Sequence, residues 1–178
     1  SDSEYLGALR RYHRALRGRN SLLRNNGTDT ELAAFETEMS TAAAILGKRR
    51  REGVLELASH FGKRYQKIGG PAETSSLRYL PDIEIEEVDG FARCLRDGRE
   101  RDRLAKATQR GPHRDDFAFV LNDRDVRKFA SEGQQRSIVL ALRFGQADFL
   151  LQRQGVRPLI LVDDVLGELD SRRQSNFC

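Results

Sequence analysis

Apolar residues in the first 70 positions recur at the three- and four-residue spacing that places them on one face of a helix. The first series runs from Tyr5 to Leu23, and Arg19 interrupts its heptad seam once. A second series, from Leu32 to Ile68, follows an Asn-Asn-Gly sequence that is typical of a helix end. A short connection between two long amphipathic helices predicts an antiparallel helical hairpin over residues 1–70.

The middle of the chain predicts short strands and turns. The stretch 77–80 is typical of a strand, which Pro81 ends. The highly charged stretch 91–104 predicts an exposed helix. Alternating apolar residues over 117–121, followed by an Asn-Asp turn, predict a hairpin whose returning strand spans 126–129.

A long amphipathic pattern predicts a helix from Gln134 to Gln154. Ser131 and Gly133 stand at the start of this helix, where unpaired N–H groups and the positive end of the helix dipole favour phosphate. A Ser hydroxyl adds a donor, and Gly lets a ligand approach the backbone. A plain Ser cap is the alternative interpretation.

An unbroken apolar run, Leu159 to Val162, leads directly into the carboxylates Asp163 and Asp164. Such a run predicts a strand that is buried on both faces. Carboxylates at the end of such a strand lie where open α/β sheets bind ligands, and a metal ion bound to phosphate is their usual partner. A solvated turn after the strand is the alternative.

Composition narrows the class of protein. The chain has 178 residues, of which 33% are charged, and a net charge of +4 that is compatible with an acidic partner. No apolar run approaches the roughly 18 residues of a membrane span. Cys94 and Cys178 form no metal cluster, and neither do His113 and Asp115 without further ligands. We expect a cytoplasmic protein with no membrane segment, and we expect the chain to be a fragment.

Arginines dominate the polar faces of the predicted hairpin. Arg10, Arg14 and Arg17 share one face, and such a stripe can follow a phosphate backbone. Arg19 is counted with these polar-face arginines, and Lys48 begins a second basic group that ends at Arg51. The alternative is an ordinary solvated helix surface paired with nearby acids. Those acids are Glu36, Glu38 and Glu52.

The motifs in this order resemble the C-terminal half of an ABC-type ATPase head. Ser131-Glu-Gly-Gln-Gln-Arg136 resembles the signature motif, Leu159 to Asp164 resembles Walker B, and Gly167-Glu-Leu-Asp170 resembles the D-loop. Heads with a helical-hairpin insertion form the group that contains SMC, RecN and RecF proteins, and within it the chain resembles the bacterial RecF family. The further matching stretches are Leu9–Arg17, Arg19–Arg24, Gly111–Asp116 and Phe129–Arg136.

The resemblance implies an α/β fold, of which this chain alone would have an α+β appearance. Residues 71–178 would be the C-terminal lobe of an ABC-type P-loop ATPase head, and residues 1–70 its helical-hairpin arm. The family resemblance also implies an ATP-dependent DNA-repair clamp that binds DNA at single-strand gaps. Such a clamp acts with RecO and RecR to help load recombinase, and it forms an ATP-dependent homodimer.

The resemblance also assigns roles to residues. Asp163 would hold Mg²⁺, Asp164 would orient or deprotonate the attacking water, and Asp170 would report across the dimer. The residues expected to contact the γ-phosphate of ATP held by the partner head are Ser131, Gly133 and Gln134. DNA contacts are expected from Arg10, Arg14 and Arg17.

The chain departs from the family pattern at three points. Asp164 stands where many ABC heads carry Glu, which shortens the reach to water, and Gly167 stands where Ser is commoner. The Walker A pattern Gly-x4-Gly-Lys-[Ser/Thr] is absent from the sequence. We therefore expect that this chain alone neither holds ATP tightly nor hydrolyses it.

Two other classes of protein remain open. A non-enzymatic architectural module, whose arm binds DNA or protein, would use the same hairpin without nucleotide chemistry. A RecN- or SMC-like head fragment is the other class, although those families insert much longer coiled coils than the hairpin predicted here.

Overall fold

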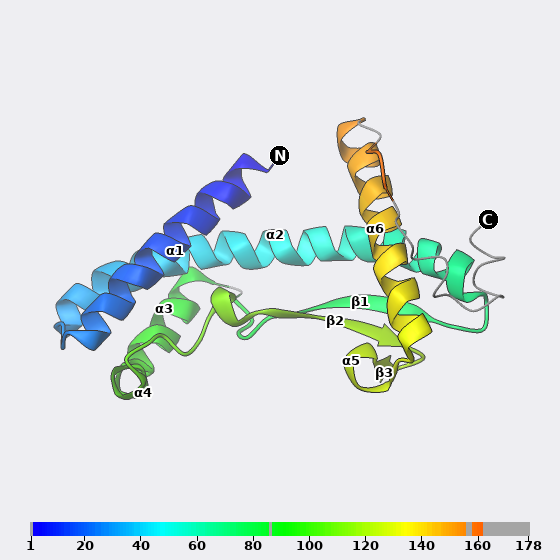
Figure 1. The fold of residues 1–178 in the computed structure, drawn as a ribbon. Coiled ribbons are helices and arrows are strands. Elements are labelled where there is room, and N and C mark those ends of the chain that lie inside the picture. The colour runs from blue at the N-terminus through cyan, green and yellow to red at the C-terminus, as the bar shows by residue number, and fades with distance from the viewer. Residues whose placement is uncertain (1, 86, 156–157, 162–178) are drawn as a thin grey trace. The chain divides into compact units, whose positions relative to one another are not determined.

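The computed structural model describes residues 2–85, 87–155 and 158–161 (Figure 1). The chain divides into two compact units, and each unit is built from two separate stretches. The first unit contains residues up to 51 together with 80–116. The second contains 52–79 and the chain from 117 onward.

The first unit begins with helix α1, Ser3–Arg24, as the heptad pattern predicts. Asp2 caps this helix, because its carboxylate accepts a hydrogen bond from the Tyr5 N–H at 2.9 Å. The helix ends at the predicted Asn-Asn-Gly turn, where Asn26 adopts a left-handed φ of 55°. Ala8, Tyr12 and Leu16 lie on the buried face.

Helix α2, Asp29–Gly69, is a single helix of 41 residues that runs from the first unit into the second (Figure 1). Thr28 caps its start through a reciprocal pair of hydrogen bonds with Glu31. The pairing of Arg11 with Glu38 and of Arg49 with Glu4 shows that α1 and the first half of α2 are antiparallel. The two predicted helices and their antiparallel pairing are therefore present, and the arm over residues 1–70 as a domain stays a prediction.

Arg19 lies in the core of the first unit, and its expected place among the exposed arginines is wrong. Its side chain is fully buried, and its guanidinium contacts Glu36 at 3.1 Å and Asp102 at 2.7 Å. Further hydrogen bonds reach the Thr108 hydroxyl and the Leu95 carbonyl. The charge of Arg19 can remain buried because Nε, Nη1 and Nη2 of the guanidinium all donate hydrogen bonds.

The expectation of one exposed helix over 91–104 is also wrong. The structure has two helices, α3 at Val88–Asp97 and α4 at Arg99–Ala105. Phe91 and Leu95 of α3 are buried in the core of the first unit. These two apolar residues lie four positions apart, so they form a narrow buried stripe on one face of α3. The stripe is hard to recognise in the sequence because many residues around it are charged.

The second unit contains a small sheet in the order β1-β2-β3. Strands β1, Ser75–Leu80, and β2, Asp116–Leu121, agree with the predicted strands. The returning strand β3 is only Arg124–Asp125, antiparallel to β2. The predicted strand over 126–129 is wrong, because Asp125 caps a short helix, α5, at Val126–Phe129.

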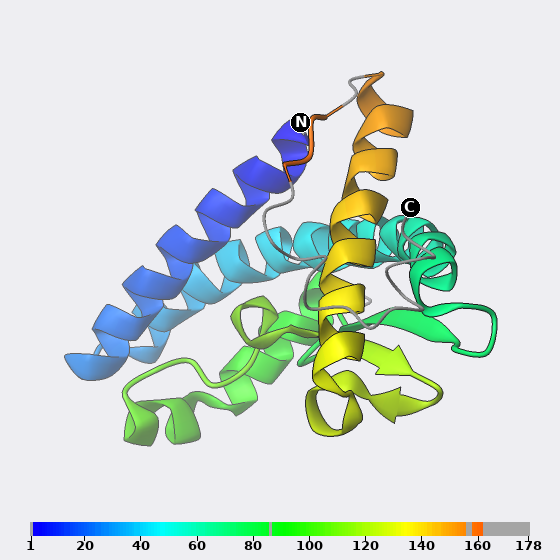
Figure 2. The ribbon, with the colours of Figure 1, turned by 45° about the vertical axis from the view of Figure 1, so that its right-hand side comes forward.

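Helix α6, Glu132–Gln154, packs on α2 within the second unit (Figure 2). Phe61 and Tyr65 of α2 join Ile138 and Ala141 of α6 in one buried cluster. Arg64 of α2 also makes a two-point ion pair with Asp148, with distances of 2.5 and 2.6 Å. The predicted helix over 134–154 is thus present and begins two residues earlier.

Residues 158–161 have no regular secondary structure, so the predicted strand is not formed in this part of the chain. Leu159 and Leu161 are each 87% exposed. A strand that is apolar on both sides needs neighbouring strands to pair with, and β1, β2 and β3 do not supply them here. Val162 and the carboxylates that follow it lie outside the described residues. No helix in the described part of the chain is long and apolar enough to cross a membrane.

Candidate functional site

The start of α6 is organised by a capping box between Ser131 and Gln134. The Ser131 N–H donates to Oε1 of Gln134 at 2.9 Å, and the Gln134 N–H donates to the Ser131 hydroxyl at 3.3 Å. Ser131 is extended, with a φ of −64° and a ψ of 161°, as an N-cap residue requires. The reciprocal bonds fix the direction in which the chain enters the helix.

Gly133 leaves open space beside the first turn of α6. Apart from its chain neighbours and the backbone of its own helix, a Cβ atom at this position would meet nothing within 4 Å. The first N–H groups of an α-helix have no partner inside the helix, and they stand at the positive end of its dipole. A helix start of this kind can accept an anion such as a phosphate group, and the phosphate contact expected of Ser131 and Gly133 stays a prediction.

Gln134 is held at both ends of its side-chain amide. Its Oε1 accepts from Ser131, while its Nε2 donates to Oε1 of Glu73 at 2.8 Å. The other oxygen of Glu73 accepts a 2.7 Å hydrogen bond from the Tyr65 hydroxyl. The Gln134 oxygen thus caps the start of α6. The sequence predicts a phosphate contact for Gln134 and does not predict this capping role.

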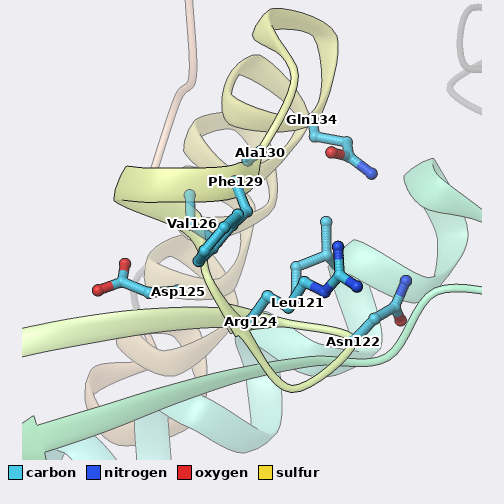
Figure 3. Close-up of a pocket in the computed structure, with 8 residues that line it drawn as sticks. All are labelled: Leu121, Asn122, Arg124, Asp125, Val126, Phe129, Ala130 and Gln134. Atoms are coloured by element: carbon cyan, nitrogen blue, oxygen red, sulfur yellow. The ribbon is translucent and has the colours of Figure 1, made fainter.

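A hollow of about 370 Å³ lies beside this helix start, and Gln134 contributes to its lining (Figure 3). Arg124 lies over the ring of the exposed Phe129, 5.9 Å from its centroid. Figure 3 shows the polar ends of Arg124 and Gln134 on one side of the hollow, whereas Asp125 points the other way. Asp125 instead accepts a hydrogen bond from the Arg127 N–H. The hollow therefore carries positive charge next to the capping box.

Arg10, Arg14 and Arg17, the residues expected to bind DNA, are exposed on α1. The second basic group differs, because acidic side chains neutralise much of it. Within the first unit, Arg50 pairs with Asp115 at 2.5 Å and Arg51 pairs with Glu84 at 2.6 Å. Two arginines of the second basic group are thus neutralised, whereas Arg10, Arg14 and Arg17 are exposed on α1.

Asp163, Asp164 and Asp170, the residues expected to serve metal binding, water activation and dimer contact, lie outside the described residues. In the part that is described, no group of three His, Cys, Asp or Glu side chains could hold a metal ion. His113 and Asp115 accordingly have structural partners.

His113 is locked between two polar atoms in the first unit. Its Nε2 lies 3.1 Å from the Thr108 carbonyl, to which it must donate a hydrogen bond. Its Nδ1 therefore accepts from the Tyr12 hydroxyl at 2.7 Å. Burial lowers the pKa of His113 and raises the pKa of Tyr12. The neutral tautomer of His113 is the form that this arrangement stabilises.

The unfolding free energy is expected to decrease as pH falls below about 6.5, the pKa of an unfolded histidine. The unfolded chain then binds a proton that folded His113 resists, because its folded pKa is lowered. Urea unfolding between pH 7.5 and pH 5 would measure this loss. His113→Gln should flatten the pH dependence, whereas substitution of the exposed His13 by Gln should not. Equal profiles for the wild-type and His113→Gln proteins would contradict the assignment.

Comparison with known proteins gives a consistent set of relatives, although a scan of protein-family models finds no match. The chain is 37% identical to a protein of Trichlorobacter lovleyi named DNA replication and repair protein RecF, over 99% of the chain and 49% of that protein. A protein of the same name from Herpetosiphon aurantiacus is 35% identical over 99% of the chain and 47% of that protein.

Solved structures support the same relationship. A structure described as the recombination mediator protein RecF-ATP in the RecFOR pathway matches with a TM-score of 0.86 and 29% identity, over 98% of this chain and 49% of that one. A second, described as RecF-ATPrS, matches with a TM-score of 0.82 and 30% identity, over 97% of this chain and 49% of that one. The chain spans about half the length of the curated relatives it matches.

Proposed function

Because this chain belongs to the RecF family and corresponds to about half of a family member, we propose that it forms part of an ATP-dependent DNA repair and replication protein. The start of α6 is the observation that carries the proposal. Its Ser-x-Gly-Gln sequence, its open Gly133 and the positive end of its helix dipole suit the γ-phosphate of ATP.

In this proposal the nucleotide lies between two copies of the protein. Ser131 and Gly133 offer donors to the γ-phosphate of ATP held by the second copy, and Gln134 fixes the helix start from which they project. Asp170 of the D-loop belongs to the same dimer contact. Each copy thus completes the site of the other, so ATP binding favours the dimer over the separate protomers.

The carboxylates after residue 162 supply the chemistry of hydrolysis in this proposal. Asp163 would hold Mg²⁺, which supplies neutralising charge to the phosphates when bound. Asp164 would orient the attacking water or accept its proton. Its side chain is one methylene shorter than Glu, so slow turnover is expected.

The arm is proposed to bind DNA at single-strand gaps. Arg10, Arg14 and Arg17 are exposed along α1, and cations in such a row can each contact a phosphate. RecO and RecR are the proposed protein partners, because the solved relatives are described as members of the RecFOR pathway. The role that follows is to help load recombinase at the gap.

The test uses the protein extended to the length of its relatives, with and without gapped DNA. The variant Asp164→Asn should reduce ATP turnover by about 100-fold or more, because it removes the proton acceptor. ATP-dependent dimerisation should remain. The 178-residue chain by itself should show no appreciable turnover, since it lacks a Walker A sequence.

Other results would favour a non-enzymatic architectural module. Absence of turnover in the extended wild-type protein, with DNA binding that ignores ATP, would contradict the proposed ATPase. Appreciable ATP turnover by the 178-residue chain would contradict the expectation that this chain alone does not hydrolyse ATP.

A further inference from the structure

A continuous line of hydrogen bonds connects the last turns of α2 with the start of α6 in the second unit. The Tyr65 hydroxyl donates to Glu73 at 2.7 Å, and Nε2 of Gln134 donates to the other oxygen of Glu73 at 2.8 Å. Oε1 of Gln134 in turn accepts from the Ser131 N–H at 2.9 Å. Glu73 is therefore the link between a buried tyrosine and the capping box.

The turn after α2 brings Glu73 into this position. Gly70 has a φ of 86°, a left-handed conformation that glycine adopts without strain. A Cβ atom on Gly69 would lie 2.7 Å from a ring carbon of Tyr65 and 2.8 Å from a carboxylate oxygen of Glu73. The two glycines thus let the chain fold back so that Glu73 reaches Tyr65 and Gln134.

The carboxylate of Glu73 determines which way the Gln134 amide faces. An ionised carboxylate only accepts hydrogen bonds, so the NH₂ group of Gln134 must point toward Glu73. The amide oxygen then points toward the Ser131 N–H and completes the capping box. Without Glu73, a long side chain with several rotamers would be held at one end only.

We propose that Glu73 is a positioning residue for the nucleotide site, and that it acts through Gln134 to hold Ser131 and Gly133 toward the ATP of a second copy. The inference rests on the proposed function. It goes further by assigning a role to a residue outside the signature sequence, on the turn after α2. The γ-phosphate donors are then preorganised before the second copy arrives.

The main test compares Glu73→Ala with the wild-type protein, both extended to the length of their relatives. Glu73→Ala should weaken ATP-dependent dimerisation by about tenfold, because a charge-assisted hydrogen bond that orders the site is lost. The affinity of the separate protomer for ATP should not change, since Glu73 is proposed to act on the ATP that a second copy holds. Sedimentation with ATP and nucleotide titration of dilute protomer measure the two quantities.

Glu73→Gln is the conservative variant and should restore dimerisation. Its amide oxygen can accept from Gln134 while its NH₂ group donates to the Tyr65 hydroxyl. Hydrogen exchange without nucleotide gives an independent readout at the helix start. Exchange of the Ser131 N–H should be faster in Glu73→Ala than in the wild-type and Glu73→Gln proteins, because the capping box loosens.

Asp148→Asn is the matched control. It breaks the ion pair with Arg64, which also joins α2 and α6 in the second unit but lies away from the helix start. This variant should lower the melting temperature without weakening dimerisation. If Glu73 were merely structural, Glu73→Ala would behave like Asp148→Asn, and the inference would be overturned.

The positioning role of Glu73 and the proposed function can be contradicted by different results. A wild-type protein that dimerises with ATP, beside a Glu73→Ala variant that dimerises equally well, would overturn the positioning role alone. A wild-type protein that does not dimerise with ATP would overturn the proposed function together with the positioning role.

Discussion

Replacing Arg19 by methionine is expected to lower the unfolding free energy by about 3–5 kcal/mol, the range for breaking a buried ion pair from one side. Methionine is unbranched like the aliphatic stem of arginine, but it is shorter and offers no donors. Glu36 keeps its two-point contact with Arg99, whereas Asp102 keeps mainly the Gln109 N–H. The loss therefore comes chiefly from the carboxylate of Asp102, which is left buried with too few partners.

Urea unfolding at pH 7 measures this effect, and Arg17→Met is the matched control. Arg17 lies on the same helix but is exposed, so its replacement should change the unfolding free energy by less than about 0.5 kcal/mol. Similar losses in the two variants would show that the buried network adds little. An unfolded Arg19→Met protein at 25 °C would agree with the expected loss.

The burial of Arg19 shows where periodicity and residue type disagree. Its position falls within the apolar seam of α1, so the helical spacing alone places it inward. Its charge suggests the opposite. The decision depends on Glu36 and Asp102, which lie 17 and 83 residues away in the sequence. Only the folded chain brings these carboxylates together, so the helix was predictable and its buried charge was not.

Replacing Gly145 by alanine is expected to lower the unfolding free energy by about 3 kcal/mol, at the upper end of the range for overpacking. A Cβ atom at this position would lie 2.9 Å from the Phe61 backbone nitrogen and 3.1 Å from its Cα atom. Backbone atoms cannot rotate away as a side chain can. The two helices must separate, and the buried cluster between them loses contact.

Thermal and urea unfolding of Gly145→Ala would be compared with Gly62→Ala. Gly62 lies in α2 of the same unit, and a Cβ atom there would meet only the Ser75 carbonyl at 3.9 Å. Gly62→Ala should therefore raise stability by up to about 1 kcal/mol through helix propensity. A Gly145→Ala protein as stable as Gly62→Ala would contradict the close helix crossing.

The start of α6 was largely predictable, because Ser and Gln three residues apart form a recognised cap sequence. The sequence correctly places Ser131 and Gly133 at a helix N-terminus. Glu73 had no local signal, since it lies 61 residues from Gln134 and follows a glycine-rich turn. Its role depends on the packing of α6 against α2, which the sequence predicts only as two separate amphipathic patterns.

The apolar run at 159–162 marks another limit of sequence reasoning. The apolar composition of a segment indicates that it needs a buried environment. A strand, however, forms only when another strand pairs with it. Leu159 and Leu161 belong to a segment with the composition of a buried strand, and both are nevertheless exposed. The described sheet, in the order β1-β2-β3, does not include this run.

The close approach of α6 to α2 also constrains how the gene can vary. Every amino-acid replacement of glycine adds at least a Cβ atom, so each non-synonymous base change in the codon for Gly145 introduces the clash with Phe61. Neutral drift at this codon is therefore limited to synonymous bases. Phe61 meets this glycine through its backbone, and its fully buried side chain belongs to the cluster between the helices, so it is constrained for a different reason. A library of coding variants should thus be depleted far more strongly at position 145 than at Gly62, where an added Cβ atom has room.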